Sequence, residues 1–129
     1  MNRYYLDTSA AAKFLVDEAE SVRLAQWADS PDVALVATHL LETELRRFAV
    51  RFDLAQVNVT AILARVEIYN LAPSVYREAG LLPGTTLRSL DALHLAASIR
   101  LDVAALVTYD VRLSEAAADV GLRVHAPSA

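Results

Sequence analysis

The sequence predicts an α/β fold in three layers, α/β/α, with a central parallel sheet of four to five strands. Short apolar runs of strand length alternate with segments of helical periodicity, and no internal repeat, low-complexity stretch or linker interrupts this order. Strands that alternate with helices form parallel sheets that helices cover on both faces. The predicted strands, in chain order, are Arg3–Leu6, Val33–Ala37, Glu67–Leu71, Ala104–Tyr109 and Leu122–His125.

Helical periodicity and turn residues place the helices between these strands. Pro73 suits the first turn of a helix, and Leu82–Thr85 is the clearest loop of the chain. The predicted helices are Ala10–Val16, Ala19–Ala28, His39–Phe52 behind Thr38, one that Asn58 or Thr60 opens, Ser74–Leu82, one that Ser89 opens around Asp91, and one that Asp110 caps and Gly121 ends.

Length and composition favour one domain spanning residues 1–129. A chain of 129 residues can bury one sizeable core and is too short for two ordinary domains. No apolar run approaches the roughly 18 residues of a membrane span, and the first residues lack the apolar core of a signal peptide. With no cysteine, the sequence has no disulfides and no thiolate metal site. We therefore expect a cytoplasmic protein without membrane contact.

The apolar fraction and the net charge both bear on partners. The hydrophobic content of 55% exceeds that of ordinary globular domains, which predicts that another chain covers some apolar surface. The net charge of -4 argues against a generic nucleic-acid coat, which should be basic. This net charge does not exclude an enzyme that binds nucleic acid locally through metal ions.

Asp91 lies within a helix that is apolar on nearly every side and shares a face with His94, three residues later. A carboxylate in such a helix costs free energy unless a cation or hydrogen-bond donors compensate it. Taken alone, Asp91 also has a structural explanation, because an acid in a first turn after an N-cap at Ser89 interacts favourably with the helix dipole.

Two further acids follow predicted strands. Asp7 comes directly after the first strand, and Asp110 directly after the apolar run that ends at Tyr109. Parallel strands end at the same edge of a sheet, and open α/β proteins bind ligands outside that edge. Each acid is equally explained as a helix N-cap, so the pair by itself is only suggestive.

Glu44 lies within the predicted inward stripe of a helix, which consists of Leu41, Glu44, Leu45, Phe48 and Phe52. The helical pitch turns Glu42 about 200° away from Glu44, so Glu42 is interpreted as a solvated acid. Glu44 then needs an explanation: a buried ion pair with an arginine, an edge position that lets the side chain reach solvent, or a functional role.

Together, Asp7, Glu44, Asp91 and Asp110 predict a metal site. Carboxylates brought together repel one another, and some take up protons unless a cation neutralises them. Oxygen ligands without cysteine favour Mg²⁺ or Mn²⁺ over zinc. We expect His94 to be a packed, hydrogen-bonded residue rather than a ligand, because these ions prefer oxygen.

Four segments of the chain, in order, resemble the acidic motifs of PIN domains, and in particular of the VapC-type toxin ribonucleases of bacterial toxin–antitoxin pairs. The third and fourth motifs are the more specific, and the resemblance covers the whole chain. The four segments are Tyr4–Ala10, Leu41–Arg47, Ser89–Ala96 and Val107–Leu113.

This resemblance implies a PIN-like α/β/α fold and metal-dependent endonucleolytic cleavage of RNA. It also implies a homodimer and a small antitoxin protein that occludes the site. The family's roles carry over to Asp7 and Asp91 as principal metal ligands, with Glu44 and Asp110 completing the acidic pocket. Asp110 occupies the position that varies most in the family. We expect hydrolysis with water as the nucleophile, oriented by Asp110 or Glu44.

RNA binding by an acidic protein requires local positive charge. Arg46 and Arg47 follow Glu44 on one helix, and Lys13 and Arg112 lie near Asp7 and Asp110. These four side chains are candidate phosphate ligands, and an ordinary solvated charged surface is the alternative interpretation.

Two other classes of function remain open. A phosphoaspartyl phosphatase needs a second acid two residues after Asp7, where Ser9 stands, and a receiver domain needs a late lysine, whereas the sequence has none after Lys13. The second alternative is a catalytically inert PIN-like module that binds RNA or protein, and the intact set of acids weighs against it.

Overall fold

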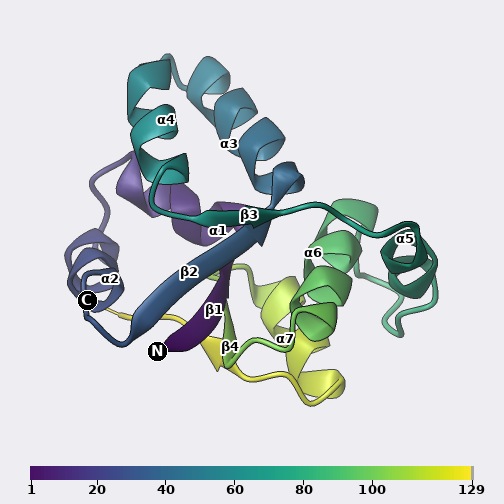
Figure 1. Ribbon diagram of the computed structural model, residues 1–129. Coiled ribbons are helices and arrows are strands. Elements are labelled where there is room, and N and C mark those ends of the chain that lie inside the picture. Colours follow the sequence, from purple (N-terminus) through teal and green to yellow (C-terminus); the bar gives the residue numbers. More distant parts are fainter. Residues whose placement is uncertain (129) are drawn as a thin grey trace.

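A computed structural model describes residues 1–128 and contains one five-stranded sheet in which all paired strands run parallel (Figure 1). Its strand order is β3-β2-β1-β4-β5. The chain adds strands on one side of β1 first and then crosses to its other side. The strands are β1 (Asn2–Leu6), β2 (Val33–Thr38), β3 (Glu67–Tyr69), β4 (Ala105–Val107) and β5 (Val124–His125).

Helices cover both faces of the sheet, which confirms the predicted three-layer α/β/α architecture (Figure 1). One face carries α1 (Thr8–Ala11), the 3₁₀ helix η1 (Ala12–Phe14), α2 (Ser21–Ala28), α3 (His39–Arg51) and α4 (Gln56–Leu63). The other carries α6 (Ser89–Arg100) and α7 (Val111–Asp119), with α5 (Pro73–Gly80) packed outside α6. None of the helices formed by residues 1–128 combines the length and apolarity that a bilayer crossing requires.

The central strands are buried on both sides, because alternate side chains of a strand point to opposite faces. Tyr5, Val36 and Leu106 lie in register across β1, β2 and β4 and pack in the cluster that contains α6 and α7. Their neighbours Leu6 and Val107 pack in the opposite cluster, among the residues of α1 to α4. All five are 0% exposed, so the sheet centre is a rigid base for whatever stands at its edge.

Several predicted helix boundaries are corrected. The helix expected over Ala10–Val16 begins earlier, at Thr8, because the Asp7 side chain caps it, and it tightens into η1 after one turn. Helix α4 begins at Gln56, before the expected Asn58 or Thr60, and has no side-chain cap. Ser89 is the first residue of α6 rather than its cap; the extended residue Arg88 precedes it and makes no capping hydrogen bond.

The inward stripe of α3 is partly corrected. Leu41 and Leu45 are fully buried as expected, and Ala49 continues the buried row. Phe52, expected in that row, is 55% exposed. Helix α3 ends at Arg51, and Phe52 has left the helical conformation, so its ring lies against Phe48 with ring centroids 4.7 Å apart.

We predict that Leu45→Ala lowers the free energy of unfolding by about 2–5 kcal/mol, because it leaves a cavity in the core. Phe52→Ala should cost only about 1 kcal/mol, the scale of one aromatic contact. Urea denaturation of both variants measures the difference. Equal losses would mean that Phe52 belongs to the core after all.

Candidate active site

The candidate site lies at the carboxyl edge of the sheet, where β1 and β4 adjoin. The chain reverses its direction of winding between these two strands, and open α/β sheets bind ligands at such a point. The Asp7 backbone N–H donates to the Val107 carbonyl at 3.2 Å, which holds the two strand ends together. Asp7 and Thr108, the residues that follow them, are buried, with exposures of 2% and 0%.

Asp7 is enclosed by hydrogen-bond donors. Its Oδ2 accepts from the Thr108 hydroxyl at 2.6 Å, and its Oδ1 accepts from the Ser9 hydroxyl at 2.8 Å and from the Ala10 backbone N–H at 3.0 Å. Burial raises the pKa of Asp7 above its ordinary value, although these donors partly offset the effect. The hydrogen bonds therefore fix the orientation of the Asp7 carboxyl, while burial still makes its ionisation unfavourable.

Glu44 projects from α3 with a side chain that is 23% exposed. Its Oε1 accepts from the Thr8 hydroxyl at 2.9 Å and also contacts Nε2 of His94. Burial opposes ionisation of this carboxyl, but the hydrogen bonds from His94 and from the Thr8 hydroxyl lower its pKa. Glu44 thus favours the ionised form beside an acid, Asp7, whose pKa is raised.

His94 is 1% exposed and uses both ring nitrogens, since Nδ1 is 2.7 Å from the Tyr5 hydroxyl. The Tyr5 hydroxyl lies in turn 3.2 Å from Oγ1 of Thr38. This agrees with the expectation of a packed, hydrogen-bonded histidine.

Asp91 and Asp110 complete the acidic edge. Asp110 caps α7 by accepting from the Leu113 backbone N–H at 2.9 Å, as expected from the sequence. Asp91, in the first turn of α6, has no hydrogen-bond or ion-pair partner within residues 1–128. Burial raises its pKa, and so do the negative charges of Asp110 and Glu44. Asp110 and Glu44 are thus near enough to act on Asp91, whose charge the positive groups of His94 and Arg88 offset only in part.

As the side chains stand, no three Asp, Glu, His or Cys residues of the described part of the chain form a group that could hold a metal ion. Asp7, Glu44 and Asp110 each have an oxygen that accepts a hydrogen bond from a protein donor. The donor chemistry still fits a hard cation, because the edge offers only oxygen ligands and Asp91 is unpaired within residues 1–128.

The candidate RNA-binding cations fall into two groups. Lys13 is paired with Glu18 and Glu20 and lies over the Tyr109 ring, while Arg46 pairs with Glu42 and donates to Gln56 and Thr60. Both already have protein partners.

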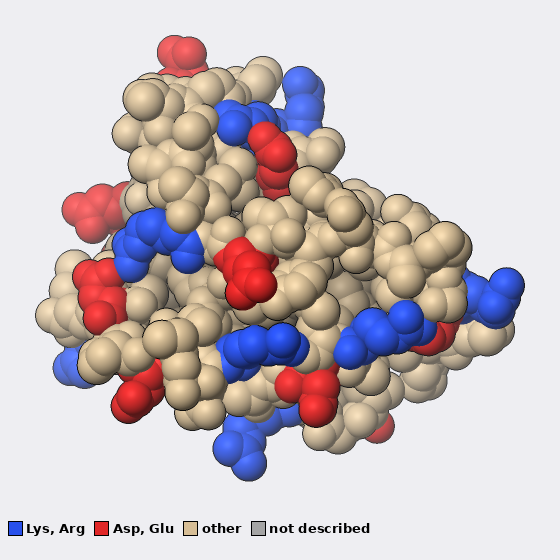
Figure 2. Space-filling model, in the orientation of Figure 1, with Lys and Arg blue, Asp and Glu red and all other residues tan. Residues whose placement is uncertain are grey.

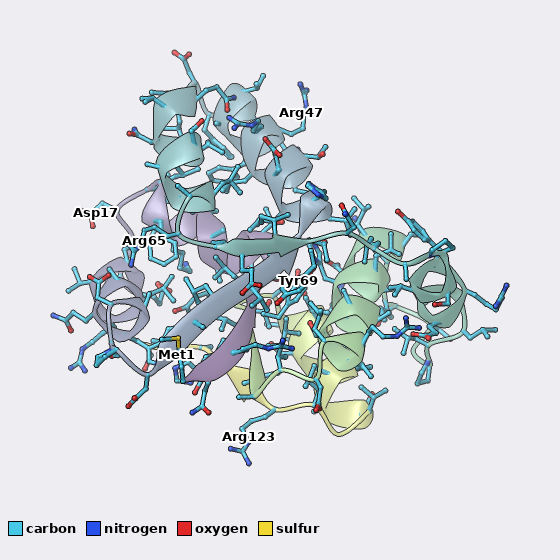
Figure 3. The ribbon with its side chains drawn as sticks, in the orientation of Figure 1. Met1, Asp17, Arg47, Arg65, Tyr69 and Arg123 are labelled. Carbon is cyan, nitrogen blue, oxygen red and sulfur yellow. The ribbon has the colours of Figure 1, made fainter. Side chains whose placement is uncertain are left out.

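Arg47 and Arg112 are exposed and make no ion pair with any residue the structure describes. Figure 3 shows Arg47 projecting outward from α3. On the face drawn in Figure 2, basic and acidic residues are interspersed and no continuous basic surface forms.

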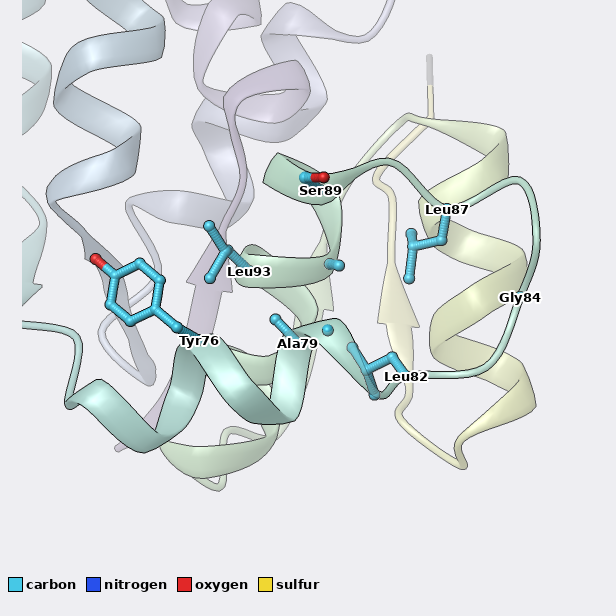
Figure 4. Close-up of a pocket in the computed structure, with 9 residues that line it drawn as sticks. Tyr76, Ala79, Leu82, Gly84, Leu87, Ser89 and Leu93 are labelled. Carbon is cyan, nitrogen blue, oxygen red and sulfur yellow. The ribbon is translucent and has the colours of Figure 1, made fainter.

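A separate cavity of about 360 Å³ lies between α5, α6 and the loop that joins them (Figure 4). Tyr76, Leu82 and Leu93 are among its mainly apolar lining residues, and none of the four acids lines it. Because Asp91 and Leu93 are two residues apart on a helix, they point in nearly opposite directions. The cavity is therefore distinct from the acidic edge.

Sequence patterns do not single out Tyr5 and Thr38, which the structure joins to the site through His94. A signal for Tyr5 exists, because it lies two residues before Asp7 and so shares its side of the extended chain. A buried tyrosine hydroxyl also needs a hydrogen-bond partner. The hydroxyls of Thr8, Ser9 and Thr108 hold the carboxyls of Glu44 and Asp7.

This parallel sheet with acids at its switch point is the architecture of a PIN domain. The family model described as PIN domain matches residues 4–119, and the chain belongs to this family.

Over nearly its whole length the chain is similar to ribonucleases of the VapC group. It is 39% identical to Ribonuclease VapC35 of Mycobacterium tuberculosis, covering 95% of this chain and 96% of the relative. Ribonuclease VapC47 of the same organism is 37% identical, with 97% of each chain covered. Relatives named as ribonucleases give no support to the catalytically inert alternative.

Among solved structures, VapBC2 from Rickettsia felis bound to a DNA fragment from their promoter superposes with a TM-score of 0.76. The match covers 98% of this chain and 99% of the other at 14% identity, which shows a shared fold.

We predict that Asp91→Asn raises the midpoint of thermal unfolding at neutral pH in chelator-treated buffer. The folded state raises the pKa of Asp91, so its ionisation becomes destabilising as the pH rises above the unfolded value of 3.8. Below that value the carboxyl is protonated in both states, and the stability difference from the wild type should disappear. Differential scanning calorimetry across this pH range measures it.

Asp17→Asn is the matched control, since Asp17 is exposed and lies at the periphery of the molecule (Figure 3). Its midpoint should follow that of the wild type at every pH. A less stable Asp91→Asn protein would contradict the electrostatic description of this edge.

Proposed function

We propose that this chain is a divalent-metal-dependent endoribonuclease and the toxin of a toxin–antitoxin pair. The observation that carries the proposal is the gathering of Asp7, Glu44, Asp91 and Asp110 at one edge of the sheet, on a chain related over its full length to ribonucleases. The reaction is hydrolysis of an RNA phosphodiester bond with water as the nucleophile.

Mg²⁺ or Mn²⁺ suits this donor set, with Asp7 and Asp91 as the principal ligands and Glu44 and Asp110 completing the site. Such ions, when bound, lower the pKa of water and stabilise charge on the attacking and leaving oxygens. Ser9 and Thr108 hold the Asp7 carboxyl in one orientation. Glu44, kept ionised by His94, or Asp110 accepts a hydrogen bond from the attacking water and aligns it.

The exposed guanidinium groups of Arg112 and Arg47 are the better candidates for RNA phosphate contacts. Arg112 lies two residues after Asp110, at the start of α7, and Arg47 lies three residues after Glu44 on α3. Lys13 and Arg46 are weaker candidates, because binding RNA would disrupt their ion pairs with Glu20 and Glu42.

A small antitoxin protein and a second copy of this chain are the proposed partners. Solved structures of similar fold include a toxin-antitoxin complex from Klebsiella pneumoniae, and the apolar content of this chain exceeds that of ordinary domains. Large apolar side chains are exposed on α3, α4 and the segment that joins them, which offers contact area: Val50, Phe52 and Val57 are 55% to 72% exposed. In keeping with its function, the protein is proposed to act in the cytoplasm.

We predict that Asp7→Asn and Asp91→Asn each reduce RNA cleavage by at least about 100-fold while preserving the fold. Loss of an outer-shell partner already costs about 10- to 100-fold, so loss of a ligand should cost no less. Digestion of total RNA with Mg²⁺ or Mn²⁺, with the fragment ends mapped, measures activity, and circular dichroism measures folding. Asp17→Asn is the control, and undiminished cleavage by either site variant would refute the proposal.

We further predict that Arg112→Gln flattens the salt dependence of RNA affinity. Each phosphate contact on a single strand contributes about 0.7 to the slope of log affinity against log salt concentration. The measurement uses the Asp91→Asn background so that RNA stays intact. Arg77→Gln, which removes an exposed charge from α5, is the matched control and should leave the slope unchanged. Equal slopes for all three proteins would assign Arg112 to the solvated surface.

A further inference from the structure

We propose that His94 is a positioning residue whose ring, locked by Tyr5, sets the placement of Glu44 at the acidic edge. The effect of this positioning on catalysis rests on the proposed function, whereas the hydrogen bonds themselves do not depend on it. The network runs from Thr38 through Tyr5 and His94 to Glu44.

The direction of each hydrogen bond follows from what each group can donate. Glu44, when ionised, only accepts, so His94 carries a hydrogen on Nε2. A neutral ring then accepts at Nδ1, and the Tyr5 hydroxyl donates to it. Tyr5 has no second hydrogen, so the hydroxyl of Thr38 donates to the Tyr5 oxygen. Tyr5 thereby selects one tautomer of His94, the one that can hold Glu44.

This network is more polar than packing requires. Tyr5, His94 and Thr38 are at most 1% exposed, and burying polar groups costs free energy that apolar side chains of similar shape would avoid. The network does not end in the core. It ends at Oε1 of Glu44, where the Thr8 hydroxyl converges on the same oxygen. Oε2 receives no hydrogen bond from residues 1–128, which leaves it available at the edge of the sheet.

The members of the network adjoin three of the four acids in the sequence. Tyr5 and Thr8 lie on either side of Asp7, and Thr38 immediately precedes α3, which carries Glu44. His94 lies one helical turn after Asp91 and shares its face of α6. One hydrogen-bonded network therefore joins β1, β2, α1, α3 and α6 and ends on the carboxylate of Glu44.

Removing the Tyr5 hydroxyl should loosen this arrangement without altering the shape of the core. We expect Tyr5→Phe to weaken Mn²⁺ binding and to lower kcat, each by about 10- to 100-fold, the usual cost of losing an outer-shell partner. KM should change little, because no RNA-contacting group is altered. Tyr4→Phe is the matched control, since Tyr4 is the adjacent residue, lies on the opposite face of the sheet and packs against Trp27.

The experiment has two arms that do not depend on RNA cleavage. Nitrogen-15 NMR of the histidine rings in metal-free protein at neutral pH reports which nitrogen of His94 carries the hydrogen. Titration calorimetry with Mn²⁺ alone reports the affinity of the site. The proposal requires hydrogen on Nε2 alone in the wild type, loss of that single tautomer in Tyr5→Phe, and weaker Mn²⁺ binding in Tyr5→Phe than in Tyr4→Phe.

Failure of any of these results overturns the positioning role, including a ring with its hydrogen on Nδ1. If the wild type binds Mn²⁺ and passes both arms yet cleaves no RNA, the proposed function is wrong and the positioning role stands. Should Tyr5→Phe fail to fold, the Mn²⁺ arm is carried out with His94→Gln and His94→Leu, and equal Mn²⁺ affinities of these two variants would overturn the positioning role. As a rescue, His94→Gln, which keeps an N–H donor, should retain more Mn²⁺ affinity than His94→Leu.

Discussion

The arrangement of this molecule depends on how the carboxyl group of Asp7 is held at the junction of β1 and β4. Hydroxyls from Ser9 and Thr108 and a backbone N–H from α1 all point to it. The same group caps α1, so it fixes the start of the first helix and the separation of the two strand ends. A polar group with almost no solvent contact can persist there only because donors from both strand ends surround it.

The acids whose negative charges destabilise the folded protein are the same residues that are proposed to bind a metal ion. Glu44 accepts hydrogen bonds from His94 and Thr8, and Asp110 accepts one at the amino end of α7, whereas Asp91 accepts none from residues 1–128. An edge built for folding alone would avoid an unpaired carboxylate beside two others. Proteins commonly accept such local instability at functional sites, where it supports binding of an opposite charge.

The sequence was sufficient for the layers, the parallel sheet and the position of three acids after strands or within a helical stripe, because periodicity and strand ends are local features. It was insufficient wherever a contact joins distant segments. The His94–Tyr5 hydrogen bond spans 89 residues, so no pattern reveals it. The hydrogen bonds of Arg46 to Gln56 and Thr60 depend on how α3 packs against α4. Phe52 shows the limit of periodicity itself, which does not tell where a helix ends.

The central place of β1 in the sheet has a consequence for biosynthesis. This strand is synthesised before the other four, but its partner β4 lies about 100 residues later, and Thr108, whose hydroxyl holds Asp7, lies 101 residues after Asp7. Long-range pairing of this kind delays folding. A ribosome must therefore complete most of the polypeptide before the Asp7 environment can assemble, so truncated or nascent chains lack a finished acidic edge.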